Sequence, residues 1–274
     1  MIKEDQVSGQ FYEAHPDRLS ARLDQLLTRV PAFSCDQPVS IVIVPHAGHQ
    51  YSGPVAAYGF EAIRRSQPSY KTVILLGPTH YYTFEGVALW PRGAFRTPLG
   101  LIEVDEVFCA HLMENCLHVQ AMPRVFERDH VLEVELPFLQ KVLKDFKIVP
   151  LIMSRSADRL VLEDLATALD KLIGTRRDAL LLISSDLSHF HPEPEARRID
   201  EMGLKVIEAM NIEALWDGHQ KENLEIDGYK EVMTALLYAR KRGLKKVQRL
   251  KYATSGDVTH DRKSVVGYAA LVIT

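Results

Sequence analysis

The sequence predicts a single α/β domain built on a mixed, mostly parallel sheet with helices on both faces. Aliphatic runs such as 41–44, 73–76 and 180–183 contain no polar residue, which is typical of strands that are covered on both sides. Amphipathic helical segments alternate with these runs along the chain, as they do around parallel sheets. No stretch rich in Pro, Gly and Ser divides the 274 residues, and no internal repeat is present, so residues 1–274 are expected to form one domain.

The first third of the chain predicts an amphipathic helix followed by a βαβ unit. The segment 11–30 carries an apolar stripe at helical spacing after Pro16, a residue that favours the first turn of a helix. A buried strand, a helix and a second buried strand follow at 40–44, 54–65 and 72–76. A right-handed crossover places the loops after both strands at the carboxyl edge of the sheet, where ligands bind in open α/β folds.

The rest of the chain predicts a hairpin and further alternating elements. Segments 86–90 and 100–104 are extended and bounded by turn signals, which predicts a hairpin or a meander. Residues 132–143 predict a helix in which Pro137 causes either a kink or a late start. The remaining helices are expected at 105–116, 157–173, 196–210, 212–220 and 229–242, and the remaining strands at 147–152, 179–183, 247–252 and 265–272. The last two strands should add an antiparallel contribution to the sheet.

Composition and charge exclude several classes of function. A net charge of −3 argues against the basic face that nucleic-acid binding needs. The three cysteines, at 35, 109 and 116, are odd in number and lack CxxC spacing, which favours neither a disulfide framework nor a zinc ribbon. The segment 1–6 lacks the apolar core of a signal peptide, and no apolar run reaches the about 18 residues that span a bilayer. We therefore expect a cytoplasmic protein that binds neither nucleic acid nor membranes.

Three histidines each follow a predicted buried strand. His46 comes after strand 40–44, His80 after strand 72–76, and His189 just beyond strand 179–183. A single histidine in such a place is more often a structural residue whose ring is bound by a backbone carbonyl. Because parallel strands bring these loops to one edge, the shared placement of all three favours a common functional site.

Two of these histidines and one acid have the residue types of a metal site. His46, His80 and Asp227 could form the facial triad of two histidines and one carboxylate, which leaves coordination positions open for substrate or O₂. The single carboxylate partly neutralises a divalent ion and leaves its open face Lewis acidic. The structural alternative is that Asp227 caps the helix that begins at Gly228.

The other candidate catalytic residues are His189, Asp186 and His130. His189 could carry a proton near neutral pH, and Asp186 could orient that imidazole or a metal-bound water. Alternatively, Asp186 is only a cap or turn residue. His130 could donate to a bound oxyanion or oxygen, unless it is a helix-start residue tied to Glu133. We interpret His219, among others, as structural or solvent-facing.

Several short motifs occur in order along nearly the whole chain: GQFY at 9–12, PHAG at 45–48, YSG at 51–53, GPTH at 77–80, DHVLEVELPF at 129–138, SSDLSH at 184–189, TSGD at 254–257 and VVGYAA at 265–270. In their order and spacing the chain resembles the Memo family, whose bacterial and archaeal branch is often called AmmeMemoRadiSam system protein B. Memo proteins are similar in fold to class III extradiol dioxygenases, the non-haem iron enzymes that open catechol rings. The resemblance therefore implies an extradiol-dioxygenase-like fold.

The resemblance also implies a role for each site residue. The family's two metal-site histidines fall on His46 and His80, the acid/base histidine of the dioxygenases on His189, and the additional site histidine on His130. The third metal position is a cysteine in the animal Memo proteins, whereas here it is Asp227. A hard carboxylate in place of a soft thiolate moves the preference toward iron(II) or manganese(II) and away from copper(I) or zinc. Iron(II) is the expected cofactor, with manganese(II), copper and zinc as alternatives.

These observations leave three hypotheses about function. The first is an iron(II) dioxygenase that cleaves a small catechol-like aromatic substrate. The second is a non-catalytic metal- or peptide-binding adaptor that works with radical SAM and AMMECR-like partner proteins, as the family name implies. The third is metal-assisted hydrolysis, which needs the same triad and an activated water.

Overall fold

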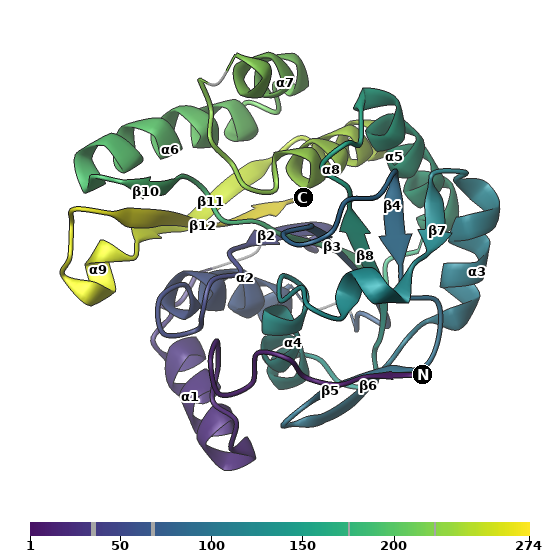
Figure 1. Ribbon diagram of the computed structural model, residues 1–274, viewed down its shortest axis with the longest axis horizontal. Helices are drawn as coiled ribbons and strands as arrows, with labels where there is room; N and C mark the ends of the chain where they lie inside the picture. The colour runs from purple at the N-terminus through teal and green to yellow at the C-terminus, as the bar shows by residue number, and fades with distance from the viewer. Residues whose placement is uncertain (34–36, 67–68, 175, 222) are drawn as a thin grey trace.

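A computed structural model describes residues 1–33, 37–66, 69–174, 176–221 and 223–274 of the chain (Figure 1). Cys35 lies outside the described residues. The strands of the main sheet are β2 (Ile41–Val44), β3 (Thr72–Pro78), β4 (Val87–Leu89), β7 (Val119–Ala121), β8 (Lys147–Met153), β9 (Ala179–Ser184), β10 (His189–His191), β11 (Val247–Thr254) and β12 (Val265–Ile273). Their order is β10-β12-β2-β9-β3-β8-β4-β7, and β11 also pairs with β12.

The centre of the sheet consists of four parallel strands. β9 pairs with β2 on one side and with β3 on the other, and β3 also pairs with β8. The loops after all four strands therefore lie at one edge of the sheet, as the aliphatic runs predicted. One feature of the order was not predicted: β9 lies between the two strands of the first βαβ unit. Antiparallel pairing of β12 with β2 confirms the expected contribution from the end of the chain.

Helices cover both faces of this sheet (Figure 1). They are α1 (Pro16–Thr28), α2 (Gly53–Arg65), α3 (Glu106–Asn115), α4 (Leu136–Val142), α5 (Arg159–Ile173), α6 (Glu193–Glu208), α7 (Ile212–Gln220), α8 (Tyr229–Arg242) and the short α9 (Gly256–Thr259). α2 packs on one face together with α1 and α4, while α8 and its neighbour α5 cover the other. α6 packs on β11 and β12 and contacts α7. The predicted architecture is confirmed and is consistent with the fold of the class III extradiol dioxygenases.

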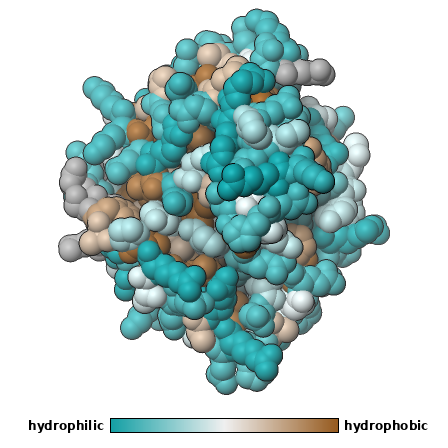
Figure 2. Space-filling model, turned by 90° about the vertical axis from the view of Figure 1, so that its left-hand side faces the viewer, coloured by the Kyte–Doolittle hydropathy of each residue, from teal (hydrophilic) through white to brown (hydrophobic). Residues whose placement is uncertain are grey.

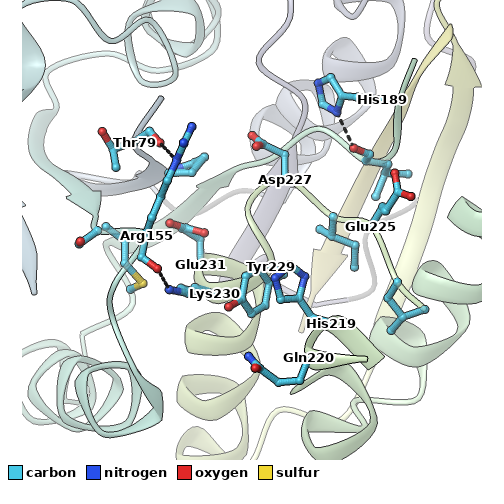
Figure 3. Close-up of a pocket in the computed structure, with 16 residues that line it drawn as sticks. Thr79, Arg155, His189, His219, Gln220, Glu225, Asp227, Tyr229, Lys230 and Glu231 are labelled. Carbon is cyan, nitrogen blue, oxygen red and sulfur yellow. Dashed lines mark hydrogen bonds between the residues drawn. The ribbon is translucent and has the colours of Figure 1, made fainter. Parts of the chain in front are cut away.

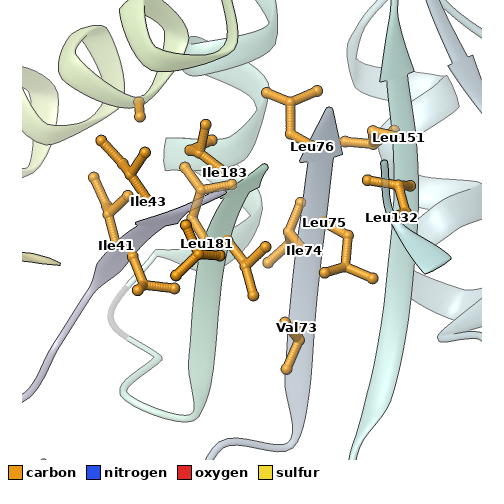
Figure 4. Packing of buried hydrophobic residues seen from close by; sticks show 14 of the residues in the cluster. Ile41, Ile43, Val73, Ile74, Leu75, Leu76, Leu132, Leu151, Leu181 and Ile183 are labelled. Atoms are coloured by element: carbon orange, nitrogen blue, oxygen red, sulfur yellow. The ribbon is translucent and has the colours of Figure 1, made fainter. Parts of the chain in front are cut away.

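The core lies where these helices meet the central strands. Figure 4 shows the aliphatic side chains of β2, β9 and β3 side by side, and all of them are buried. Leu19, Leu23 and Leu26 form the buried stripe predicted for α1. Each such side chain contributes roughly 1.5–3 kcal/mol when it leaves water. By contrast, the surface in Figure 2 is mainly hydrophilic and shows hydrophobic residues in small separate areas.

The predicted hairpin exists, but its first strand was assigned wrongly. β6 (Gly100–Glu103) pairs with β5 (Ala94–Thr97) instead of with segment 86–90, and β1 (Ile2–Lys3) completes this small sheet. Segment 86–90 contributes β4 to the main sheet, where it pairs with β8 and β7. The physical reason is burial: all three residues of β4 are buried, whereas β6 is largely exposed.

The helix predicted at 132–143 has a late start, one of the two outcomes expected from its proline. The 3-10 helix η2 (Glu133–Glu135) precedes α4, and Pro137 lies in the first turn of α4. Proline is tolerated there because the N–H of the first turn has no partner within the helix. A second 3-10 helix, η1 (Pro123–Phe126), was not predicted. Within the described residues, the helices are too short or too polar to cross a membrane.

Candidate metal centre

The carboxyl edge of the sheet brings His46, His80 and Asp227 together. His46 follows β2 and His80 follows β3, and their ring centroids are 5.4 Å apart. Asp227 lies just before α8, and its Oδ2 is 3.0 Å from His46 Nε2 and 3.4 Å from His80 Nε2. These ligand atoms all lie within 4.8 Å of one another, which is the arrangement that a single metal ion requires.

Hydrogen bonds outside the cluster decide which ring nitrogen faces inward. Ser184 Oγ donates to the Val131 carbonyl at 2.6 Å, so it accepts from Nδ1–H of His46 at 2.9 Å. His80 Nδ1–H donates to Asp129 Oδ1 at 3.2 Å. Both Nε2 atoms therefore face the centre, where they can bind a metal once they are deprotonated, and the partners on Nδ1 fix the ring orientation as they do in known metal sites.

The backbones of the two histidine loops are also held by carboxylates. The His46 N–H donates to Asp186 Oδ1 at 2.8 Å, and the His80 N–H donates to Asp129 Oδ2 at 2.7 Å. Asp186 was predicted to orient His189 or a metal-bound water. In the structure its carboxylate holds the His46 loop, and its Oδ2 lies 4.0 Å from His189 Nε2, beyond hydrogen-bond distance.

A close backbone approach places Asp227. The Asp227 N–H donates to the Asp186 carbonyl at 3.2 Å, and the Gly228 N–H donates to Ser185 Oγ at 3.0 Å. A Cβ on Gly228 would lie 2.8 Å from the Ser185 Cβ, so only glycine fits here. The capping alternative for Asp227 is wrong, because Gly228 occupies the N-cap position of α8 and no side chain caps that helix.

The charges of the cluster stabilise one another. Burial favours the neutral form of Asp227, but the adjacent imidazole rings of His46 and His80 outweigh it and hold the pKa of this carboxyl well below its usual range. Burial alone would lower the pKa of His80, yet Asp129 and Asp227 raise it to about 10. Against the same burial, Asp186 and Asp227 raise the pKa of His46. The His80 ring thus holds a proton where a cation would otherwise sit.

The residues fit a divalent metal. Asp227 Oδ2 is a buried atom that receives no well-aligned hydrogen bond within the described chain, although two Nε2 atoms lie within 3.4 Å of it. The two Nε2 atoms and Asp227 Oδ2 point at one another without forming aligned hydrogen bonds, which is how the ligands of a single ion are arranged. The donor set of two imidazoles and one carboxylate is that of a non-haem iron(II) site.

The two remaining predicted histidines flank this cluster in different ways. The His130 ring stacks on that of His80 at 5.0 Å and contacts Phe11 at 4.4 Å. Burial and the neighbouring histidines lower the pKa of His130 to about 3, so its ring is neutral. His189 Nδ1–H donates to the Leu187 carbonyl at 2.9 Å, and among the described residues its Nε2 has no hydrogen-bond partner.

The alternative that tied His130 to Glu133 is wrong. The Glu133 carboxylate instead holds the N-terminal segment, since it accepts from Lys3 Nζ at 2.7 Å, from the Val7 N–H at 2.9 Å and from the Tyr12 hydroxyl at 2.8 Å. Glu133 and Lys3 are both buried.

A cavity of about 810 Å³ opens beside Asp227 (Figure 3). Its wall includes His189 and several polar residues that were not predicted to belong to the site: Thr79, Arg155, His219, Glu225, Tyr229, Lys230 and Glu231. His219 was interpreted as structural or solvent-facing, but its ring stacks on Tyr229 at 3.3 Å in the cavity wall. Arg155 could have been found, because it follows β8, whose end lies at the same edge as those of β2, β3 and β9.

Comparison with known proteins gives a consistent result. The family model described as Memo-like protein matches residues 3–272. A MEMO1 family protein of Sulfolobus acidocaldarius is 35% identical over 99% of both chains, and one of Thermotoga neapolitana is 34% identical over 100% of both. A MEMO1 family protein of Methanopyrus kandleri is 32% identical over 99% of both chains. These matches cover nearly the whole chain and include every residue of the candidate metal centre, and the chain therefore belongs to the Memo family.

Proposed function

We propose that this protein is a mononuclear non-haem iron(II) oxidoreductase that opens the ring of a catechol-like aromatic substrate with O₂. The observation that carries the proposal is the convergence of His46 Nε2, His80 Nε2 and Asp227 Oδ2 beside a cavity of about 810 Å³. A carboxylate as the third ligand favours iron(II) or manganese(II) over copper(I) and zinc. Cavities of this size accommodate small organic ligands.

The bound metal would supply a Lewis-acidic, redox-active centre with open positions for the substrate oxygens and O₂. His189 Nε2 would accept a hydroxyl proton from the substrate, because Nδ1–H is committed to the Leu187 carbonyl. His130, neutral and stacked on His80, would donate a hydrogen bond to oxygen. In the overall reaction one ring carbon–carbon bond breaks, both oxygen atoms of O₂ enter the product, and no further reductant is needed.

The direct test combines metal analysis with oxygen consumption. Protein purified without O₂ and loaded with iron(II) should bind one equivalent of iron and consume O₂ when catechols are added. Asp227→Asn should abolish both properties, while Asp217→Asn, on the exposed surface of α7, should leave both unchanged. Failure to bind iron after loading would sink the proposal. Product formation that persists without O₂ would indicate hydrolysis instead.

A second candidate function is that of an adaptor for radical SAM and AMMECR-like partner proteins. Two exposed aromatic residues favour it: Tyr81, 53% exposed, follows His80, and Phe190, 74% exposed, follows His189. Aromatic side chains of this kind are enriched in protein interfaces. Partner binding that survives a His46→Ala, His80→Ala double substitution but not Phe190→Ala would support the adaptor.

We also propose that the protein works in a reducing compartment such as the cytoplasm. Cys109 and Cys116 are free, buried thiols, and burial raises the pKa of both. Thiols of this kind are stable where disulfides do not form.

A further inference from the structure

The cavity beside the metal centre carries two cationic side chains, Arg155 and Lys230, and among the described residues no carboxylate forms an ion pair with either. Arg155 Nε donates to the Thr79 carbonyl at 3.1 Å and Nη2 donates to the His80 carbonyl at 3.2 Å. Its Nη1 has no hydrogen-bond partner in the described part of the chain. Lys230 is only 8% exposed, and its Nζ donates to the Arg155 carbonyl.

The acids of the cavity wall do not compensate these cations. Glu225 accepts from His191 Nε2 at 2.8 Å, and Asp227 faces the two ligand histidines. Burial raises the pKa of Glu231 to about 8, so this group is mostly uncharged at neutral pH. A buried ammonium group without a paired anion is costly, and burial lowers the pKa of Lys230 accordingly.

Arg155 is also connected to the metal centre. Its guanidinium binds the carbonyl of His80, whose Nε2 lies 3.4 Å from Asp227 Oδ2. In Figure 3, Asp227 is drawn between Arg155 and His189, and all three line the same cavity. A group bound to the outer nitrogens of Arg155 in this cavity would share it with the metal ligand Asp227.

We propose that Arg155, supported by Lys230, binds a carboxylate on the substrate, so that the substrate of this site is an acid. A planar guanidinium fits a carboxylate with two parallel hydrogen bonds, and such charge-assisted pairs are among the strong ones in proteins. That the acid is also an aromatic diol rests on the proposed function, whereas the carboxylate does not.

Three ligands separate the two parts of this inference: 3,4-dihydroxybenzoate, catechol and benzoate. Their binding is measured by calorimetry on zinc-loaded and metal-free protein, so that no turnover is needed. The natural protein should bind 3,4-dihydroxybenzoate at least tenfold more tightly than catechol. Arg155→Gln should weaken the binding of 3,4-dihydroxybenzoate and benzoate by about 10- to 100-fold and should change the affinity for catechol by no more than about twofold. Arg155→Lys should fall between the two, because it keeps the charge and loses the planar fork.

The control variant is Arg96→Gln, which removes an exposed arginine paired with Glu4 far from the cavity and should bind all three ligands normally. Equal affinity of the natural protein for catechol and 3,4-dihydroxybenzoate would overturn the inference. The inference would also be overturned if Arg155→Gln lost affinity equally for all three ligands and for zinc, since Arg155 would then only hold the His80 loop. If 3,4-dihydroxybenzoate binds no more tightly than benzoate while binding still depends on Arg155, the proposed function is wrong but the carboxylate site is supported.

Discussion

At the scale of single residues, the site depends on which ring nitrogen of each histidine carries a proton. Ser184 and Asp129 make that choice by binding Nδ1 of His46 and His80. The sequence predicted the histidines, because each follows a strand. It did not predict these partners, since they are 138 and 49 residues away along the chain.

We expect Asp129→Asn to weaken metal binding by about 10- to 100-fold, because the negative charge of Asp129 on Nδ1–H makes Nε2 of His80 a stronger metal ligand. Metal affinity would be measured by competition with a chelator of known affinity. Asp158→Asn serves as the control: Asp158 caps α5 through the Val161 N–H, and in the described part of the chain it makes no hydrogen bond to His46, His80 or Asp227. Unchanged affinity in Asp129→Asn would show that the hydrogen bond has no influence on the ligand.

Gly228→Ala should lower both the stability and the metal affinity. The new methyl group would collide with Ser185, at a cost of roughly 1–3 kcal/mol, and relief of that collision moves Asp227. Asp227→Asn is the comparison, because it should lose metal affinity without a similar loss of stability. Urea unfolding and metal titration of both variants test this expectation, and it is wrong if Gly228→Ala binds metal normally.

Metal affinity should rise with pH between about 6 and 9. The neighbouring carboxylates raise the pKa of His80 to about 10, so a proton occupies its ring at neutral pH in the metal-free site, and they also raise the pKa of His46. Metal must displace the proton on His80, and displacement becomes easier as pH rises. Calorimetry in buffers of different ionisation enthalpy should show proton release on binding, and His80→Ala should release fewer protons. Affinity independent of pH would contradict this account.

At the scale of elements, the long buried runs were predictable and the short ones were not. β2, β3 and β9 consist mainly of apolar residues, as strands covered on both faces do, and these runs are visible in the sequence. β1 and β10, of two and three residues, owe their existence to pairing with distant strands and have no signal of their own. Arg155, which also follows a strand of the main sheet, was not predicted to belong to the site.

Glu133, in the short helix η2, should hold the N-terminal segment in its folded position. Glu133→Gln leaves Lys3 buried without a counter-charge, so we expect a loss of about 3–5 kcal/mol in the free energy of unfolding. Glu4→Gln, which breaks the exposed pair with Arg96, should cost less than about 1 kcal/mol. Denaturant unfolding measures both. In the double variant Lys3→Met, Glu133→Gln much of the loss should disappear, and equal effects of the two single Glu variants would refute the role of Glu133.

At the scale of the whole molecule, metal binding and folding should be coupled, because the three ligands come from distant parts of the chain. A metal at a hundred times its dissociation constant stabilises the folded state by about 2.7 kcal/mol. For a chain of this size that corresponds to a rise in Tm of roughly 4–10 °C. Thermal unfolding with and without metal tests this, and the His46→Ala, His80→Ala variant should show no rise. A similar rise in that variant would place the metal elsewhere.

The position of Asp227 along the chain also has a consequence for biosynthesis. His46 and His80 leave the ribosome early, but the third ligand follows His80 by nearly 150 residues, and β12, which pairs with β2, is made later still. A nascent chain that ends before Asp227 carries both ligand histidines but lacks the carboxylate that completes the triad. The full ligand set therefore exists only after about four fifths of the chain has been made.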